Sequence, residues 1–129
     1  MPLVLECRSQ STIPIEVDGL VTSQFAQESK KTIATTKIWF GKNEIELGEV
    51  FDVSGNATDD ETTVWRGNLN SVHGIGASMD SGMNIIETPA GRHVGARMTG
   101  GTIEARGNVC DFAGAEMTGG TIRIHGSAG

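Results

Sequence analysis

The strongest constraint on the fold is a nine-residue phrase that occurs twice in the sequence. Residues 95–103 are GARMTGGTI and residues 114–122 are GAEMTGGTI, so the copies lie 19 residues apart and differ only at Arg97 and Glu116. A catalytic motif is seldom duplicated at such short range, whereas a stacked structural unit must be, because each copy packs on a similar neighbour. The duplication therefore predicts a repeat architecture.

The repeat extends beyond this phrase as four columns of equivalent residues, each with a spacing of 19. The columns are Gly76, Gly95 and Gly114; Ala77, Ala96 and Ala115; Met79, Met98 and Met117; and Gly82, Gly101 and Gly120. An earlier echo starts at Val64, where VWRGNLNSVHGIGASM matches residues 103–117 with one residue inserted. About three turns and the start of a fourth are therefore visible, and we expect these columns to be structural.

The length of the unit selects the fold class. A helical-pair repeat needs about 33 residues or more, and the strand-like pieces between the glycines leave no room for a long helix. We predict an all-β chain, a right-handed parallel β-helix (β-solenoid) whose coils of about 19 residues stack at about 4.8 Å. The methionine column should point inward, where a flexible thioether fills an irregular interior. The glycine columns should mark corners or close backbone approach.

The variable positions of the repeat carry charges that alternate in sign from one coil to the next. Three columns show this: Arg97 with Glu116, Glu104 with Arg123, and Glu87 with Arg106 and His125. Opposite charges that stack at coil spacing attract weakly, and like charges would repel. The pattern predicts a solvated wall and accounts for the single difference between the two copies of the phrase.

The residues before the repeats differ in character. We divide the chain into a β-rich N-terminal segment at 1–53, a loop at 54–63 and glycine-rich repeats at 64–129. A truncated repeat array is one interpretation of the last segment. The β-branched runs 3–7, 11–17, 31–40 and 43–53 predict short strands. The polar stretch 22–31 predicts one short helix that opens at Thr22 or Ser23.

Composition excludes several classes of function. The net charge is −6, so the basic surface of a nucleic-acid-binding protein is absent. The N-terminus has no basic and apolar signal segment, and no stretch approaches the roughly 20 apolar residues of a membrane helix. Cys7 and Cys110 form no CxxC motif, which indicates two reduced cysteines in a cytoplasmic protein. We expect no nucleic-acid or membrane partner.

The sequence contains no recognisable catalytic, metal or phosphate-binding motif. His73, His93 and His125 fall in different columns of the repeat, and no HExxH or Cys/His cluster exists. GIGASM at residues 74–79 lacks the third glycine and the strand–helix context of a dinucleotide site. The acidic run Asp59, Asp60 and Glu61 suits a solvated loop better than a weak calcium site. We predict no catalytic residues and no metal in this chain. No cofactor-binding residue can be assigned from the sequence.

Two segments resemble a known family. The run GNVCDFAGAEMTGGTIRIHGSAG at 107–129 resembles the repeat region of the C subunit of formylmethanofuran dehydrogenase and, more loosely, the C-terminal glycine-repeat domain of glutamate synthase. The stretch KIWFGKNEIELGEVFDVSG at 37–55 is similar to the segment before the repeats in the dehydrogenase C subunit and favours that family. The resemblance covers about residues 37–129.

The resemblance implies a structural subunit of a cytoplasmic one-carbon complex. One version is an archaeal oxidoreductase that reduces carbon dioxide onto methanofuran with a molybdenum or tungsten pterin and iron–sulfur clusters. The other is the bacterial formyltransferase/hydrolase complex, which moves a formyl group to a methanofuran-like carrier and hydrolyses it, and which we slightly prefer. In both, the metal, the carrier and the chemistry belong to partner subunits, including a formyltransferase and a metallohydrolase-like chain, and this chain has no cofactor of its own.

Two other functions stay open at this point. The chain is alternatively a stand-alone β-helix carbohydrate-active enzyme, or a structural domain of the glutamate synthase type. The repeat also halts at RIHGSAG, residues 123–129, where a further coil would begin. We expect either a fragment of a longer subunit or an end covered by a partner or by self-association, because an uncovered coil is adhesive.

Overall fold

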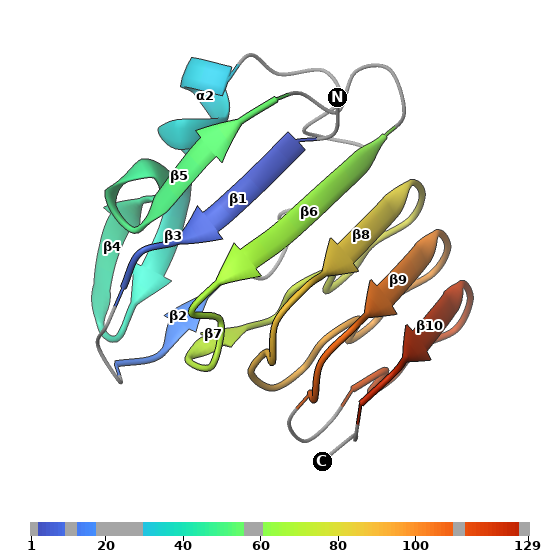
Figure 1. Ribbon diagram of the computed structural model, residues 1–129. Coiled ribbons are helices and arrows are strands. Elements are labelled where there is room, and N and C mark those ends of the chain that lie inside the picture. Colours follow the sequence, from blue (N-terminus) through green and yellow to red (C-terminus); the bar gives the residue numbers. More distant parts are fainter. Residues whose placement is uncertain (1–2, 10–12, 18–29, 56–60, 110–112, 127–129) are drawn as a thin grey trace.

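The computed structural model describes residues 3–9, 13–17, 30–55, 61–109 and 113–126, and the statements below concern those residues (Figure 1). They are mostly β, with one short helix and one 3₁₀ turn. The elements are β1 (Leu3–Cys7), β2 (Ile15–Glu16), α2 (Lys30–Ala34), β3 (Lys37–Phe40), β4 (Asn43–Glu46), η1 (Leu47–Glu49), β5 (Phe51–Ser54), β6 (Thr62–Gly67), β7 (Val72–His73), β8 (Met83–Ile86), β9 (Thr102–Ala105) and β10 (Thr121–Ile124). The predicted all-β class is confirmed.

The strands form two sheets that face each other across a common core. The larger sheet has the order β10-β9-β8-β6-β1-β5, and the smaller has the order β4-β3-β2-β7. Pairing is parallel from β1 through β6, β8 and β9 to β10, and between β2 and β7. It is antiparallel between β1 and β5, β2 and β3, and β3 and β4. Both sheets are therefore mixed, whereas the repeat alone predicted parallel pairing.

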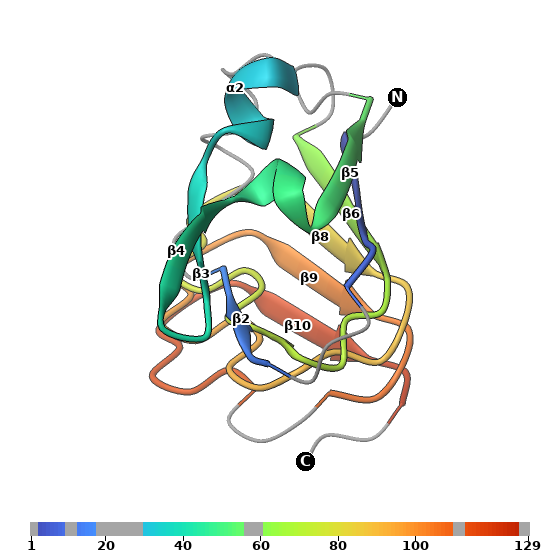
Figure 2. The ribbon, with the colours of Figure 1, turned by 90° about the vertical axis from the view of Figure 1, so that its left-hand side faces the viewer.

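The repeats stack with the period written in the sequence. Thr121 of β10 pairs with Thr102 of β9, and Thr102 pairs with Met83 of β8, so each step is 19 residues. The step from β6 to β8 is longer, because Thr62 pairs with Met83, 21 residues later. Figure 2 shows the loops of successive coils lying one above another beside these strands. The 19-residue period is thus the physical spacing of β8, β9 and β10.

The N-terminal segment shares the larger sheet with the repeats. Val4 of β1 pairs in parallel with Val64 of β6 and antiparallel with Ser54 of β5. On the smaller sheet, Ile15 of β2 pairs with Val72 of β7. One hydrophobic core joins the two regions, and it includes Leu3, Leu5, Ile33, Leu47, Phe51, Trp65, Met79, Met98 and Val109.

The predicted strand at 31–40 is wrong over its first half. Residues Lys30–Ala34 form α2, and only Lys37–Phe40 form a strand. Thr35 N–H donates to the Lys31 carbonyl, and Thr35 Oγ1 donates to the Thr32 carbonyl at 2.9 Å. Ile33 is fully buried on this turn. Burial of Ile33 and the threonine hydroxyl bonds outweigh the β preference of a β-branched run.

Other predicted boundaries also shift. The predicted strand 43–53 splits into β4 and β5, because η1 turns the chain between them and Glu46 N–H donates to the Glu49 carboxylate at 2.7 Å. The predicted loop 54–63 has strand residues at both ends, with Ser54 closing β5 and Thr62 opening β6. The helix start at Thr22 or Ser23 lies outside the described residues, as do Asp59, Asp60 and Cys110.

Candidate functional site

The methionine and alanine columns lie along the interior of the stack. Met79 and Met98 are fully buried, and Met117 is partly buried against the same core. Ala77 and Ala96 are buried, and Ala115 is half-buried. The buried members of these columns are committed to packing in the interior of the stack and present no polar side-chain group to a ligand.

The two glycine columns adopt the left-handed backbone conformation that glycine tolerates best. Gly76, Gly95 and Gly114 have φ between 68° and 75°, and Gly82, Gly101 and Gly120 have φ between 78° and 84°. Sequence reasoning missed a third column in the same conformation, which carries ordinary side chains: Ser78, Arg97 and Glu116 at φ 65°, 57° and 58°. The signal was hidden because this column varies in residue type.

A second missed column consists of glycines that are required by close approach. A Cβ on Gly100 would collide with the Asp80 carbonyl oxygen, and one on Gly119 would collide with the Thr99 carbonyl oxygen. Neither glycine has a positive φ, so the reason is packing between coils and not backbone conformation. The doubled glycine in each TGG therefore serves two purposes, since its first residue clears the coil below and its second turns the chain.

A buried polar network lies where the first coil meets the regular stack. Asn84 aligns with Ile103 and Ile122 in an inward-facing column, and its side chain is buried although it is polar. The Trp65 indole Nε1–H donates to Asn84 Oδ1 at 2.8 Å, and Asn84 Nδ2 donates to Met79 Sδ at 3.2 Å. Trp65 also packs edge to face on Phe51, with ring centroids 5.6 Å apart. The asparagine thus pairs the indole N–H that would otherwise be buried without a partner.

The exposed wall of the larger sheet carries a ladder of ion pairs. Arg66 Nε lies 3.2 Å from Glu87 Oε1, and Arg66 Nη2 donates to Glu87 Oε2 at 3.4 Å. The shorter contact has ion-pair distance but not hydrogen-bond geometry. Arg106 Nη1 lies 3.9 Å from Glu87, and Arg106 Nε donates to Glu104 Oε1 at 3.1 Å. The ladder extends the predicted Glu87–Arg106 column down to Arg66, and its charges neutralise one another.

The other predicted charge columns are aligned by the register. Arg123 pairs in the sheet with Glu104, one coil apart. The Arg97 N–H donates to the Ala115 carbonyl at 2.7 Å, which brings Arg97 beneath Glu116. Both side chains of the second pair are exposed at a corner of the coil. The alternation of sign therefore falls on neighbouring coils.

The histidines do not converge. His73 is half-buried on β7, where its Nδ1 accepts the Arg92 N–H at 2.8 Å, while His93 and His125 are exposed on other coils. No group of three His, Cys, Asp or Glu side chains in the described part of the chain could hold a metal ion. Cys7 is buried on β1, and burial raises the pKa of its thiol, against the lowering effects of a backbone hydrogen bond at Ser9 and the Arg8 charge. The thiol therefore stays protonated near neutral pH and is a poor nucleophile.

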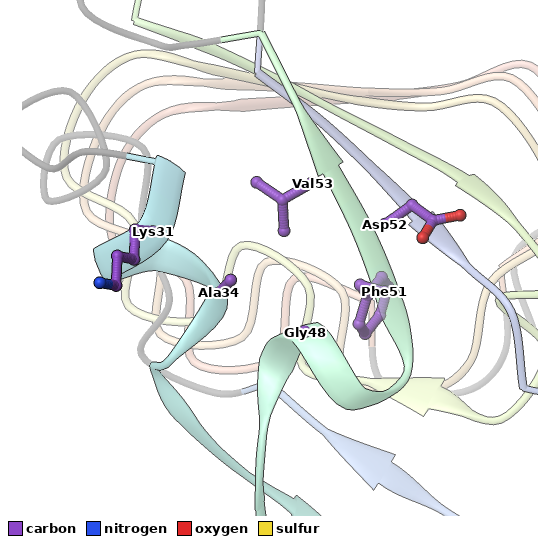
Figure 3. Close-up of a pocket in the computed structure, with 6 residues that line it drawn as sticks. All are labelled: Lys31, Ala34, Gly48, Phe51, Asp52 and Val53. Carbon is purple, nitrogen blue, oxygen red and sulfur yellow. The ribbon is translucent and has the colours of Figure 1, made fainter.

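A pocket of about 460 Å³ lies between α2, η1 and β5 (Figure 3). Its described lining residues are Lys31, Ala34, Gly48, Phe51, Asp52 and Val53. The Asp52 carboxylate is bound by Arg8 Nε at 3.2 Å, and Arg8 Nη2 donates to the Gly48 carbonyl at 2.6 Å. In Figure 3 the Lys31 amine points away from the pocket. Among the described lining residues, no acid–base or nucleophilic pair is formed.

Among the helices that the structure describes, none has the length and apolar character to cross a lipid bilayer. With the geometry established, the chain can be compared with known proteins. No protein-family profile matches it. It is 31% identical over 97 residues to the C subunit of a tungsten-containing formylmethanofuran dehydrogenase from Methanothermobacter marburgensis, over 73% of this chain and 36% of that protein. It is 38% identical over 85 residues to the C subunit of a molybdenum-containing formylmethanofuran dehydrogenase from Methanosarcina barkeri, over 64% of this chain and 28% of that protein.

The fold also matches a solved structure. A chain in the crystal structure of the formyltransferase/hydrolase complex from Methylorubrum extorquens, in complex with methylofuran, superposes with a TM-score of 0.86 at 24% identity. The match covers 97% of this chain and 47% of the other. The chain thus spans about a third of the length of the curated relatives it matches. On these similarities, the chain belongs to the family of formylmethanofuran dehydrogenase C subunits.

Proposed function

We propose that this chain is a non-catalytic structural subunit, of the C type, in a formylmethanofuran dehydrogenase or formyltransferase/hydrolase complex of one-carbon metabolism. The observation that carries the proposal is its membership of the C-subunit family over most of the described fold. The fold likeness to a chain of the formyltransferase/hydrolase complex supports it.

The residues of the repeat support the same role. Its methionines and alanines fill the core, its glycines allow the coils to turn and approach, and its exposed charges pair with one another. Such a stack offers a long rigid wall for other chains. We infer that the repeats form a right-handed parallel β-helix, which is the coil geometry that the 19-residue register favours.

The chemistry then belongs to the partner subunits. A formyltransferase and a metallohydrolase-like chain would hold the metal and the methanofuran-type carrier, and a molybdenum or tungsten pterin would lie on another subunit of the dehydrogenase version. The complex would work in the cytoplasm. A stand-alone carbohydrate-active enzyme is disfavoured, because the described face of the stack carries neutralised pairs instead of a cluster of free carboxylates.

Co-expression tests the proposal. The gene is expressed with its chromosomal neighbours, and the tagged protein should co-elute with a formyltransferase and a metallohydrolase-like chain. The protein purified alone should show no formyl transfer and no formyl hydrolysis. Turnover by the isolated protein that His93→Ala or His125→Ala abolishes would contradict the proposal. Cleavage of polysaccharides by the isolated protein would favour a carbohydrate-active enzyme. Co-elution with glutamate synthase chains would favour a structural domain of the glutamate synthase type.

A further inference from the structure

One aromatic side chain lies unusually exposed on the smaller sheet. Among the large apolar residues described, Trp39 and Ile13 are the exposed ones, at 47% and 46% of their surface. Trp39 is on β3, where its neighbour Ile38 is buried. Because successive side chains of a strand point to opposite faces, the Trp39 ring lies on the outer face of the sheet. The core therefore does not account for this ring.

Two carboxylates flank the ring across neighbouring strands. Trp39 pairs directly with Glu16 of β2 on one side and with Glu44 of β4 on the other. Directly paired residues share a face, with Cβ atoms about 4.5–5.5 Å apart. Both glutamates are exposed, and neither forms an ion pair or a side-chain hydrogen bond with a described residue. We call Glu16, Trp39 and Glu44 the Glu–Trp–Glu row.

The neighbours of the row on the same sheet include His73 of β7, which pairs directly with Glu16 on the side away from Trp39 and whose Nδ1 accepts the Arg92 N–H at 2.8 Å. The nearest cation along β3 is Lys37, and its amine is already 3.5 Å from Glu46 of the adjacent strand. On the other side along the strand, the Gly41 N–H donates to the Pro14 carbonyl at 2.8 Å, and the exposed Ile13 side chain lies against Gly41, where a Cβ would come within 2.8 Å of Ile13 Cγ2. The row is thus an exposed aromatic side chain between two exposed carboxylates that form no ion pair with a described residue, and it is bordered along the strand by Lys37 and Ile13.

We propose that the Glu–Trp–Glu row binds an arginine side chain of a neighbouring subunit, an inference that rests on the proposed role in a complex. A guanidinium is planar, stacks on an indole face and donates hydrogen bonds to carboxylates on both sides. An apolar partner would desolvate two exposed carboxylates, and an acidic partner would be repelled. Charge complementarity therefore selects a cation, and the flat aromatic face favours arginine over lysine.

Trp39 and Glu44 lie away from the stacked strands β8, β9 and β10, whereas Glu16 lies on β2 beside β7 of the first coil. In Figure 1, β3 and β4 are on the opposite side of the molecule from β8, β9 and β10. A subunit held by Trp39 would leave the wall of the repeats open for others. The outer face of the smaller sheet, at β2, β3 and β4, would then be a separate docking face.

Tryptophan emission gives a direct test, because the chain has two tryptophans and Trp65 is fully buried. Acrylamide quenching of the isolated protein therefore reports on Trp39. The protein is titrated with a blocked Gly-Arg-Gly peptide and with the same peptide containing citrulline, which is neutral. The arginine peptide should bind weakly, saturably and more tightly at low salt, and should shield Trp39 from acrylamide. The Glu16→Gln/Glu44→Gln double variant should weaken binding about 2- to 10-fold.

The matched control is Glu6→Gln/Glu116→Gln, which removes the same charge from exposed sites elsewhere and should bind like the parent protein. An equal response to the citrulline peptide, no response up to the solubility limit, or equal binding by the double variant would overturn the inference. So would a dimer in light scattering whose formation on concentration shields Trp39 from acrylamide in the absence of peptide.

The assembled complex separates this inference from the proposed function. Trp39 oxidation is compared by hydroxyl-radical footprinting and mass spectrometry in the free protein and in the co-expressed complex. Protection of Trp39 in the complex supports the inference. A complex that forms with Trp39 fully reactive overturns it and leaves the structural role intact. Failure of the subunits to associate contradicts the proposed function, while the peptide titration still decides the chemistry of the row.

Discussion

The repeat region and the N-terminal region build the same sheet by different rules. In β8, β9 and β10 each strand pairs in parallel with its successor, 19 residues away. In the N-terminal region β1 pairs with β5 and β6. Val4 therefore pairs with a residue 50 positions later on an antiparallel strand and with a residue 60 positions later on a parallel strand. The pairing of the repeat strands follows a 19-residue period in the sequence, whereas the pairing of β1 follows no period.

This difference in strand pairing indicates which contacts stabilise each region. A coil of the repeat depends on its immediate neighbours, whereas β1 joins two distant segments, β5 and β6, and covers the outer edge of β6. Burial decreases along the stack, since Met79 and Met98 are fully buried and Met117 is only partly so. We therefore expect damage to stay local in the repeats and to spread when it strikes the N-terminal strands.

Replacing a core residue with an acid gives the largest expected effect and tests this contrast. Met98→Asp should cost at least about 3 kcal/mol, because an unpaired charge is placed in the apolar interior. Hydrogen exchange should show the loss of protection centred on β9 and β10. Leu5→Asp on β1 should instead remove protection from both regions.

The control for Met98→Asp is its exposed neighbour. Thr99→Asp should stay within about 1 kcal/mol of the parent, since Thr99 is exposed and loses only a long, partly buried hydroxyl bond of 3.3 Å to the Met79 carbonyl. Equal destabilisation at positions 98 and 99 would mean that the inward face is misassigned. Uniform loss of protection in Met98→Asp would contradict the local rule for the repeats.

A glycine in each region sharpens the comparison at the level of backbone packing. Gly100→Ala should cost about 2–3 kcal/mol, because its Cβ meets the Asp80 carbonyl of the coil below and the coils cannot separate without losing their hydrogen bonds. Gly48→Ala in the N-terminal region should cost less than Gly100→Ala, since its Cβ would lie 3.1 Å from the Ala34 carbonyl oxygen, a longer contact than the one that a Cβ on Gly100 would make. Urea denaturation measures both. A larger loss at position 48 would reverse the ranking of the two regions.

The junction between the regions gives the next effect. The 19-residue period alone predicts that Asn84→Ile does not lower the stability, because isoleucine occupies this column at positions 103 and 122. The structure predicts a net loss of about 1–2 kcal/mol, because the buried Trp65 N–H loses its acceptor. A double-mutant cycle with Trp65→Phe should recover part of that loss. Additive effects in thermal or urea melts would show that the two side chains are not coupled.

The smallest effect concerns the ladder on the coil wall. Removing Arg66 and Glu87 singly and together should give a coupling of about 0.2–1 kcal/mol that weakens with salt, because both side chains are partly solvated. The N-terminal pair Arg8 and Asp52 is more exposed and should couple less on that account. A coupling that is insensitive to salt would argue against an electrostatic origin.

Local pattern predicted some elements of the N-terminal region and missed others. The run 3–7 is the strand β1, but the threonine-rich run 31–40 begins as the helix α2 because Ile33 is buried on its turn. Residue preference is weak over five residues, so tertiary burial overrides it. The Glu–Trp–Glu row was equally hidden, since Glu16, Trp39 and Glu44 become neighbours only when β2, β3 and β4 pair.

The sequence by itself determined the stacking of the repeats, because equivalent residues recur every 19 positions and only one register aligns Met79 with Met98 and both with Met117. Tertiary structure alone decided that β1 lies between β5 and β6, and that Asn84 accepts a hydrogen bond from Trp65. The physical reason is the range of the interaction. A periodic contact is repeated in the sequence, whereas a contact between unlike, distant segments is selected by packing and hydrogen-bond satisfaction across the whole core.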